Sequence, residues 1–458
     1  MAATAWYLTQ AWPAGSGFVA KYLCSSTFVS HRNPTTVFEQ DIAPVNPITS
    51  YFGYSIDKKK QKVAAGWHGV FPRTAIYREG CGCTLVIGIT EEKMRRQPLV
   101  SQGFDRNRSR HRKDLPWPRS NGGPVNPDKL GIDLPKLNAA LDNAFSESFP
   151  DTRRNTRAVV VVYKGQLVAE RYAQGVDRDT PLMGWSMSKS ITNALTGILV
   201  REGKLDIRQP APVPQWQDDK EKSKITIDHL LRMTSGLEFD EIYQPLSDTV
   251  HMLYNSHSVA AYAASKPMAA QPGSKWRYSS GTSNILAEIL RRQMETASSS
   301  YFDFIYAELF HRIGMYSAIV EPDASGTFVG SSYTLATALD WARFGQLYLQ
   351  DGVWQGERIL PAGWVEYTTS PTAGAPKGQY GAHFWLNAGS ADDPNHRRWP
   401  HAPRDTFAAL GYQGQNLIII PSRKAVLVRL GATANSDAWN TDQFIHQMLA
   451  ALPTEEPG

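Results

Sequence analysis

Apolar residues recur along the chain with two different periods, which distinguish predicted helices from predicted strands. Residues 134–145 and 190–202 carry them at helical spacing, and Gly203 ends the second stretch. Two strand-like runs, 158–163 and 166–170, are joined by the tight turn Lys164-Gly165 and predict a β-hairpin. Later segments follow the same two patterns. The strand-like ones are 407–411, 415–420 and 425–430, and the helical ones are 227–233, 283–295, 300–313, 334–348 and 440–452.

The order of these elements predicts the fold class. A hairpin comes first, a long helical middle follows, and antiparallel strands and a helix close the chain. Strands and helices that are grouped rather than alternating indicate an α+β protein. We therefore expect one antiparallel sheet that is assembled from both ends of the sequence and flanked by helices, with a mainly helical part inserted between them.

The first 130 residues differ from the rest of the chain in composition and in the motifs they carry. Residues 1–90 look ordered and are predicted to form an N-terminal extension without recognisable chemistry. Residues 91–130 combine repeated arginines with Pro-Trp-Pro and Gly-Gly-Pro, which predicts a basic Pro/Gly-rich linker. Its basic run is interpreted as a solvated connector, and contact with phosphate or a membrane surface is the alternative. Residues 131–458 form the third predicted part.

Composition and charge exclude several classes of protein. The chain has 458 residues, of which 42% are hydrophobic and 20% charged, ordinary values for a globular protein. Its net charge of +5 is too small to indicate a nucleic-acid partner. No stretch approaches the roughly 18 apolar residues of a membrane span, and residues 1–29 lack the basic and apolar regions of a signal peptide. A cytoplasmic location is therefore expected, or a cell-envelope location if the start of the chain is misassigned.

The cysteines and histidines predict neither a disulfide scaffold nor a metal site. Three cysteines are too few for a scaffold, and Cys24, Cys81 and Cys83 are expected to be buried small hydrophobic residues. A bridge from Cys24 to Cys81 or Cys83 is the alternative. No histidine stands at metal-ligand spacing, and no Gly-rich phosphate loop stands between a strand and a helix. We therefore expect no metal and no cofactor.

The sharpest chemical pattern is S-x-x-K, in the run Gly184-Trp185-Ser186-Met187-Ser188-Lys189-Ser190. Ser186 and Lys189 are three residues apart at the start of a predicted helix, a spacing that puts both side chains on one helix face. A deprotonated lysine can help to remove the proton of a serine hydroxyl, and a helix N-terminus offers N–H groups to an oxyanion. Taken alone, the pattern also fits a serine that caps a helix.

Two later segments could complete such a site. Tyr278 heads a Tyr-Ser-Ser turn before an apolar helix, where its phenol could act as a general base or a proton shuttle. The second segment is Leu410-Gly411-Tyr412-Gln413-Gly414-Gln415, where Gly414 lets a ligand or another backbone approach closely. The alternatives are a turn tyrosine that caps the next helix and a bend in an edge strand.

The three segments occur in an order that resembles the serine β-lactamase and penicillin-binding protein superfamily. The resemblance is nearest to its class C-like branch, which includes esterases, D-aminopeptidases and 6-aminohexanoate-dimer hydrolases. It covers about residues 150–450 and implies a β-lactamase/transpeptidase-like fold, with an antiparallel sheet, a helical subdomain and an N-terminal extension. The runs that carry it are Met183 to Thr192, Asp228 to Leu237, Trp276 to Asn284, and Leu335 through Trp341, Phe344 and Gly352 to Pro361.

The resemblance also implies a role for each motif residue. Ser186 would be the acylated nucleophile, Lys189 would hydrogen-bond to it, and Tyr278 would be the base in acylation and the acid toward the leaving group. The backbone N–H groups of Ser186 and Gln415 would form the oxyanion hole. Tyr243 stands where the 6-aminohexanoate-dimer hydrolases place a substrate-contacting loop tyrosine.

Two departures from the family pattern bear on the substrate. Ser280 stands where class C β-lactamases carry Asn, a change shared with the esterase and 6-aminohexanoate-dimer hydrolase relatives. The third motif, Tyr412-Gln413-Gly414, stands where β-lactamases carry Lys-Thr-Gly, so the lysine that would pair with a substrate carboxylate is absent. A neutral hydroxyl and an amide would face the substrate instead. The predicted substrate-binding residues are Gln415, Gly414, Tyr412, Tyr243 and Ser280.

The sequence therefore predicts a serine hydrolase that cleaves a small amide or carboxylic ester through an acyl-enzyme on Ser186. No metal, cofactor, nucleic-acid partner or transmembrane segment is expected. The absent third-motif lysine motivates one alternative, a non-catalytic penicillin-binding-like ligand-binding or sensor protein. Another alternative is a true β-lactamase or D-peptidase, and a further one makes residues 1–130 a separable partner-binding module.

Overall fold

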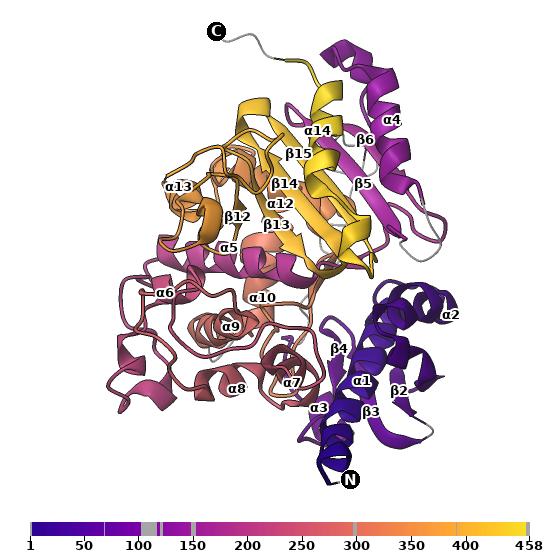
Figure 1. Ribbon diagram of the computed structural model, residues 1–458, viewed down its shortest axis with the longest axis vertical. Helices are drawn as coiled ribbons and strands as arrows, with labels where there is room; N and C mark the ends of the chain where they lie inside the picture. The colour runs from indigo at the N-terminus through magenta and orange to yellow at the C-terminus, as the bar shows by residue number, and fades with distance from the viewer. Residues whose placement is uncertain are drawn as a thin grey trace. The chain divides into compact units, whose positions relative to one another are not determined.

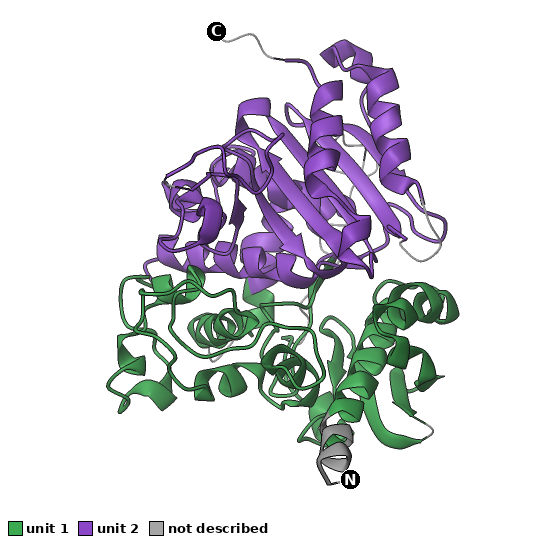
Figure 2. Cartoon of the chain, viewed as in Figure 1, with its two compact units in different colours: residues 1–104, 204–304, 319–335 green, residues 105–203, 305–318, 336–458 purple. Residues whose placement is uncertain are grey.

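The computed structural model describes residues 2–67, 69–101, 117–119, 122–147, 153–295, 300–390 and 392–454. The chain divides into two compact units, each made of several chain segments (Figure 2). Unit 1 combines Met1–Phe104, Lys204–Phe304 and Ile319–Leu335, and unit 2 combines Asp105–Gly203, Ile305–Ala318 and Ala336–Gly458. The borders of these units differ from the boundaries predicted near residues 90 and 130. The division into an N-terminal extension (1–90), a linker (91–130) and a third part (131–458) stays a prediction.

A six-stranded sheet forms the centre of unit 2 (Figure 1). Its strand order is β12-β13-β14-β15-β5-β6, and every neighbouring pair is antiparallel. The strands are β5 (Thr156–Tyr163), β6 (Gln166–Tyr172), β12 (Trp385–Leu386), β13 (Phe407–Gly411), β14 (Gln415–Ile420) and β15 (Ala425–Gly431). The pairing of β15 with β5 joins the end of the sequence to the early hairpin. This confirms the α+β class and the assembly of the sheet from both ends of the chain.

The helices of unit 2 are α4 (Leu134–Phe145), α5 (Ser188–Arg201), α11 (His311–Ile313), α12 (Ala338–Leu349), α13 (Trp364–Thr369) and α14 (Thr441–Ala451). Of these, α4, α5 and α14 begin and end within two residues of the predicted bounds. The short helix α11 is the end of the helix predicted over residues 300–313, and α13 was not predicted. The helix predicted from residue 334 begins at Ala338 instead, because the Thr337 side chain caps it by accepting the N–H of Asp340. Residues Thr334–Ala336 form the short strand β9. A small hairpin, β10 (Val353–Trp354) and β11 (Glu357–Arg358), follows α12.

The central sheet is covered on both faces, which explains its unbroken apolar runs. Val159 and Val161 of β5 lie in a core cluster with residues of α4 and α14. On the opposite face α12 packs through Gly345, where a Cβ would lie 2.6 Å from Val426 of β15. Every residue of β5 is buried. Strands that are buried on both faces have continuous hydrophobic sequences rather than alternating hydrophobic and polar residues.

Unit 1 contains the mainly helical part that the sequence predicts between the strands. Its helices are α6 (Ile227–Leu231), α7 (Asp248–Asn255), α8 (Val259–Ser265) and α9 (Ser280–Met294), and α10 (Tyr301–Ile305) runs from unit 1 into unit 2. The segment 319–335 adds β8 (Ile319–Val320), which pairs with β9.

The N-terminal part of unit 1 contains a long helix, the short helix α2 (Pro34–Val37) and a four-stranded antiparallel sheet (Figure 1). The long helix is α1 (Ala2–Phe28), and the strands are β1 (Gly53–Asp57), β2 (Lys62–Trp67), β3 (Val70–Arg78) and β4 (Gly82–Leu85). Val19, Ala20 and Leu23 of α1 are fully buried, so this helix contributes to the core of unit 1. Across the described part of the chain, no helix has both the length and the apolar character needed to cross a membrane.

A disulfide joins Cys24 of α1 to Cys83 of β4, with Cα atoms 5.9 Å apart. The prediction that the cysteines are buried small hydrophobic residues without a disulfide is therefore wrong for these two residues, and it holds for Cys81, which is buried and forms no disulfide. The physical reason is that α1 packs against β4, which brings residues 59 positions apart in sequence within disulfide distance. Sequence spacing alone does not report such a tertiary contact.

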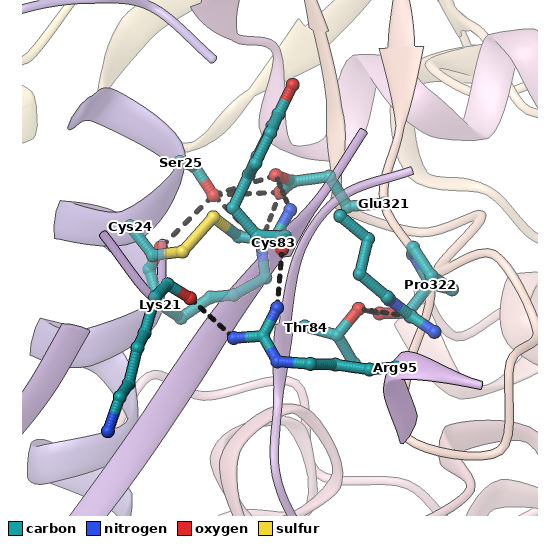
Figure 3. The surroundings of a disulfide bond; sticks show 11 residues. Lys21, Cys24, Ser25, Cys83, Thr84, Arg95, Glu321 and Pro322 are labelled. Atoms are coloured by element: carbon teal, nitrogen blue, oxygen red, sulfur yellow. Dashed lines mark hydrogen bonds and ion pairs between the residues drawn. A yellow bond between two sulfur atoms is a disulfide. The ribbon is translucent and has the colours of Figure 1, made fainter. Parts of the chain in front are cut away.

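A buried ion pair between Lys21 and Glu321 lies beside the disulfide, and the two side chains are 3% and 0% exposed. Figure 3 shows Glu321 also accepting the Ser25 hydroxyl at 2.9 Å and the Cys83 N–H at 2.7 Å. The Lys21 ammonium lies 4.1 Å from the centroid of the Tyr333 ring. These contacts fasten α1 to the 319–335 segment within unit 1.

The start of the predicted linker is ordered within unit 1. It forms α3 (Glu91–Arg95), whose Met94 packs in a core cluster with Ile76 and Ala324. The basic run from Arg106 to Lys113 lies outside the described residues. Its interpretation as a solvated connector stays a prediction.

Candidate active site

Ser186 lies in a short turn of 3-10 helix, Trp185–Met187, directly before α5. Trp185 has a φ of +48°, a left-handed backbone that bulky residues rarely adopt. Ser186 is partly exposed, whereas Lys189 is only 1% exposed. Lys189 Nζ lies 3.1 Å from Ser186 Oγ. The structure therefore brings the two residues of the S-x-x-K pattern into hydrogen-bond contact.

The third motif connects β13 to β14 and lies against the Ser186 turn within unit 2. Trp185 Nε1 donates a hydrogen bond to Gln413 Oε1 at 3.2 Å. The rings of Trp185 and Tyr412 meet edge to face, with centroids 5.6 Å apart. Gly411 is required because a side chain there would run into the carbonyl of Gly184. The third motif thus lies next to the turn that carries the predicted nucleophile.

Burial and hydrogen bonding define which groups of the third motif are available. Burial raises the pKa of the Tyr412 phenol, so its hydroxyl stays neutral over the physiological pH range. The Gln415 side chain is committed, since its Nε2 donates to the carbonyls of Tyr412 and Gly431 at 3.0 and 2.6 Å. Its Oε1 accepts the N–H of Gly431 at 3.0 Å. Any contribution of Gln415 to an oxyanion hole therefore falls to its backbone N–H, the group that the resemblance implies.

Arg429 of β15 contacts the third motif and was not among the predicted site residues. It is fully buried, and its guanidinium donates to the carbonyls of Gln413 and Gly414 at 3.2 and 2.8 Å. Burial lowers the pKa of Arg429 to about 9, so the guanidinium stays charged at neutral pH. The available sequence signal is one arginine inside an apolar strand, which indicates an unusual buried charge but not its partners.

Tyr278 lies in unit 1, half-buried in the irregular segment before α9. Ser279 caps this helix by accepting the N–H of Thr282 at 3.3 Å. Ser280 is fully buried, and its N–H and hydroxyl both donate to the carboxylate of Glu241, at 2.6 and 2.5 Å. A carboxylate is favourable at a helix N-terminus because free N–H groups point there. Glu241 was not predicted as a site residue, because its only sequence signal is its place two residues before Tyr243.

Tyr243 is 38% exposed, next to Ile242 at 53% and close in sequence to Leu246 at 43%. These three residues make an exposed apolar group on the loop between α6 and α7 of unit 1.

The predicted site residues form two groups, one within each unit. The group in unit 1 is Tyr243, Tyr278 and Ser280, and the group in unit 2 is Ser186, Lys189, Tyr412, Gly414 and Gln415. Their joint action stays a prediction.

The histidines near these groups make structural contacts. His383 is buried, and its Nδ1 lies 3.0 Å from the carbonyl of Lys189. His229 takes part in the cap of α6, where its Nδ1 accepts the N–H of Thr226 at 3.2 Å. Within the ranges that the structure describes, no three or more His, Cys, Asp or Glu side chains are grouped so that they could hold a metal ion.

A model of the Beta-lactamase family matches residues 141–452, about two thirds of the chain. The chain belongs to the beta-lactamase family. The matched range contains all of the predicted site residues, and the resemblance to the serine β-lactamase and penicillin-binding protein superfamily is confirmed.

The chain is similar to proteins that carry different functional names. The 6-aminohexanoate-dimer hydrolase of Paenarthrobacter ureafaciens is 23% identical over 339 residues, which cover 68% of this chain and 78% of that protein. Esterase EstB of Burkholderia gladioli is 28% identical over 209 residues, 40% of this chain and 52% of that protein. The solved structure of a penicillin-binding protein homologue from Caulobacter crescentus matches with a TM-score of 0.54 and 15% identity, covering 72% of this chain and 99% of that one. This last match supports the β-lactamase-like fold alone.

Proposed function

We propose that the protein is a serine hydrolase that cleaves a small amide or carboxylic ester through an acyl-enzyme on Ser186. The observation that carries this proposal is the 3.1 Å contact between Lys189 Nζ and Ser186 Oγ. A buried lysine beside a partly exposed serine is the arrangement that nucleophilic catalysis needs, because the serine must reach the substrate while the lysine is held in place. The names of the relatives, a hydrolase and an esterase, support the same class of reaction.

The proposed reaction has two steps. Ser186 Oγ attacks the carbonyl carbon, a Ser186–carbonyl bond forms, and the bond to the amine or alcohol breaks. Lys189 and Tyr278 carry the serine proton to the leaving group. Water then attacks the acyl-enzyme, the acid is released, and the proton returns to Ser186. The N–H groups of Ser186 and Gln415 stabilise the oxyanion in both steps.

The third motif supports a substrate without a carboxylate at this position. Tyr412 offers a neutral hydroxyl where many β-lactamases carry a lysine, and burial keeps the pKa of that phenol raised. A neutral hydroxyl cannot replace the ion pair that an ammonium makes with a carboxylate. Linear neutral amides and esters therefore fit this site better than carboxylate-bearing lactams do.

The test is mass spectrometry of the intact protein after incubation with a fluorophosphonate, together with hydrolysis of short-chain p-nitrophenyl esters. We expect one adduct on Ser186 and ester turnover. The Ser186→Ala variant should form no adduct and lose at least about a thousandfold in kcat, since removing a catalytic nucleophile costs about 10⁶-fold in the best-studied case. Full activity of Ser186→Ala would refute the proposal. A folded wild-type protein without adduct would favour a non-catalytic binding protein, the alternative that the missing third-motif lysine motivates.

A further inference from the structure

We propose that Arg429 is a positioning residue that holds the peptide between Gly414 and Gln415 in the orientation the oxyanion hole requires. This inference rests on the proposed function and identifies a residue that supports the proposed oxyanion hole. Arg429 touches no reacting atom in the proposed mechanism. It acts through the third motif, whose backbone it binds from β15 within unit 2.

The guanidinium of Arg429 is fully committed to neutral oxygen atoms. Nη1 donates to the carbonyls of Gln413 and Gly414 at 3.2 and 2.8 Å. Nη2 donates to the carbonyl of Arg154 at 2.6 Å and to the hydroxyls of Thr156 and Thr433 at 3.0 and 2.8 Å. Nε donates to Thr156 Oγ1 at 3.2 Å. Five donors in a rigid plane thus join the third motif to β5 and to the end of β15.

Arg429 is a buried cation that makes its direct contacts with neutral groups. Among the residues that the structure describes, no carboxylate lies within ion-pair distance of Arg429, and the more distant Glu147 only partly opposes the effect of burial on its pKa. The guanidinium lies over the Trp439 ring, 4.2 Å from its centroid. Burying a charge without a directly contacting ion-pair partner is costly, and burial accordingly lowers the pKa of Arg429. A purely structural contact could be made by a neutral side chain at lower cost.

The geometry of the peptide bond links this cation to the oxyanion hole. In a trans peptide the C=O and the N–H point in opposite directions. Arg429 binds the C=O of Gly414, so it fixes the direction of the Gln415 N–H in the same rigid plane. A charged donor on the carbonyl also polarises the amide, which makes its N–H a stronger donor. The Gln413 carbonyl is held as well, because it also accepts the N–H of Thr433 at 3.1 Å.

Two glycines make room for this arrangement. Gly414 has a φ of +77°, and a Cβ there would lie 2.5 Å from Nη1 of Arg429. A Cβ at Gly431 would lie 2.5 Å from Nη2. Either distance is too short for real atoms, so an alanine at these positions would displace the guanidinium. Gly431→Ala therefore offers a way to disturb Arg429 without removing it.

The experiment compares Arg429→Lys with wild type on a p-nitrophenyl ester, with kcat expressed per active site titrated by the fluorophosphonate. A lysine keeps the charge but cannot span the third motif and β5 together. We expect kcat to fall about 10- to 100-fold, less than the loss of a whole oxyanion-hole donor, with KM within about twofold. The inhibition constant of a trifluoromethyl ketone, whose adduct carries an oxyanion, should rise by a similar factor. Gly431→Ala should show the same pattern and serves if Arg429→Lys does not fold.

Arg343→Lys is the matched control. Arg343 is also fully buried in unit 2, where it pairs with Asp340 at 2.8 Å and donates to the carbonyl of Pro118 at 3.0 Å. This variant should lower the melting temperature and leave kcat per active site unchanged. The inference is overturned if Arg429→Lys and Gly431→Ala match Arg343→Lys in kcat and inhibition constant. A wild-type chain without adduct and turnover would instead refute the proposed function itself.

Discussion

Among the predicted substrate-binding residues, Ser280 and Tyr412 hold their hydroxyl groups in different settings. The Ser280 hydroxyl is fully buried and donates to Glu241 at 2.5 Å. The Tyr412 phenol belongs to the third motif, and its raised pKa keeps it a neutral donor. A hydroxyl that is already committed to a carboxylate has little to offer a substrate. The geometry therefore favours Tyr412 for substrate contact and a structural role for Ser280.

We expect Ser280→Ala to lower the free energy of unfolding by about 2 kcal/mol, the usual loss for a hydrogen bond to a charged group. KM for a p-nitrophenyl ester should stay unchanged. Urea unfolding and steady-state kinetics measure the two effects. Glu241→Gln is the partner variant, since it keeps the shape and removes the charge at the start of α9, and it should also lower stability. A several-fold rise in KM for Ser280→Ala at unchanged stability would instead place this hydroxyl against the substrate.

Residues could be predicted where their partner is local in sequence. Ser186 and Lys189 are three apart on one helical turn, so helix geometry alone predicts their contact. Arg429 could not be predicted, because its partner Thr156 lies 273 positions away. The same holds for Glu241 and Ser280, which are 39 positions apart. Such contacts depend on tertiary packing that no local pattern encodes.

At the scale of single elements, helix caps explain where helices start. Thr226 begins α6 with a capping box, in which its side chain accepts the N–H of His229 and the His229 ring accepts the N–H of Thr226. Burial lowers the pKa of His229, and the nearby Asp228 opposes that effect. Protonation would turn the accepting Nδ1 into a donor that faces another donor. The cap therefore depends on a neutral ring.

This cap predicts a pH dependence of stability. Because the folded pKa of His229 lies below its ordinary value of about 6.5, its contribution is present above that pH and is lost as the pH falls. His229→Gln supplies an acceptor that does not titrate in this range. Between pH 7.5 and 5 we expect wild type to lose about 1 kcal/mol more unfolding free energy than this variant, the usual worth of a cap. Parallel urea titrations at several pH values measure the difference, and identical pH profiles would contradict it.

Elements could be predicted where periodicity and boundary signals coincide. Residues 134–145, 407–411 and 415–420 form α4, β13 and β14 with the expected bounds. The start of α12 was misplaced because residues 334–336 are apolar enough to extend the helical pattern, whereas Thr337 caps the helix. The helix α1 was not predicted, since its apolar residues are interrupted by Pro13, Gly15 and Gly17. Packing in the core of unit 1 outweighs these low helix propensities.

For the whole molecule, the main surprise is how the first hundred residues are used. They pack in one compact unit with 204–304 and 319–335, rather than as a segment of their own. Sequence texture separates these stretches, because composition records neighbours along the chain and not neighbours in space. The pairing of the late strand β15 with the early strand β5 was predictable, because strand patterns occur both early and late in the sequence.

The disulfide bears on the compartment of the whole protein. Structural disulfides are typical of oxidising compartments and rare in the cytosol. The Cys24–Cys83 bond therefore favours the cell-envelope alternative over the cytoplasmic expectation. The compartment itself stays a prediction. Thiol counting on protein prepared without reductant measures whether the Cys24–Cys83 bond is formed.

The N-terminal residues also supply contacts that the rest of unit 1 cannot replace. Glu321 is fully buried and contacts Lys21, the Ser25 hydroxyl and the Cys83 N–H. Removing one partner of a buried ion pair costs about 3 to 5 kcal/mol, because the other charge stays buried or must be hydrated. The loss of α1 would add the exposure of the apolar surface that it covers. These costs are comparable to the whole stability of an ordinary domain.

A chain that begins at Asn126 should therefore fail to form a stable, active protein. Circular dichroism melting, gel filtration and ester turnover of the truncated chain measure this outcome, and we expect aggregation or a non-cooperative melt without activity. Full-length Cys24→Ser/Cys83→Ser is the matched control, since it cuts the covalent link but keeps the ion pair and the packing. It should stay folded and active with a lower melting temperature. A truncated chain that melts cooperatively near the full-length temperature and turns over normally would show that residues 1–125 are a separable module.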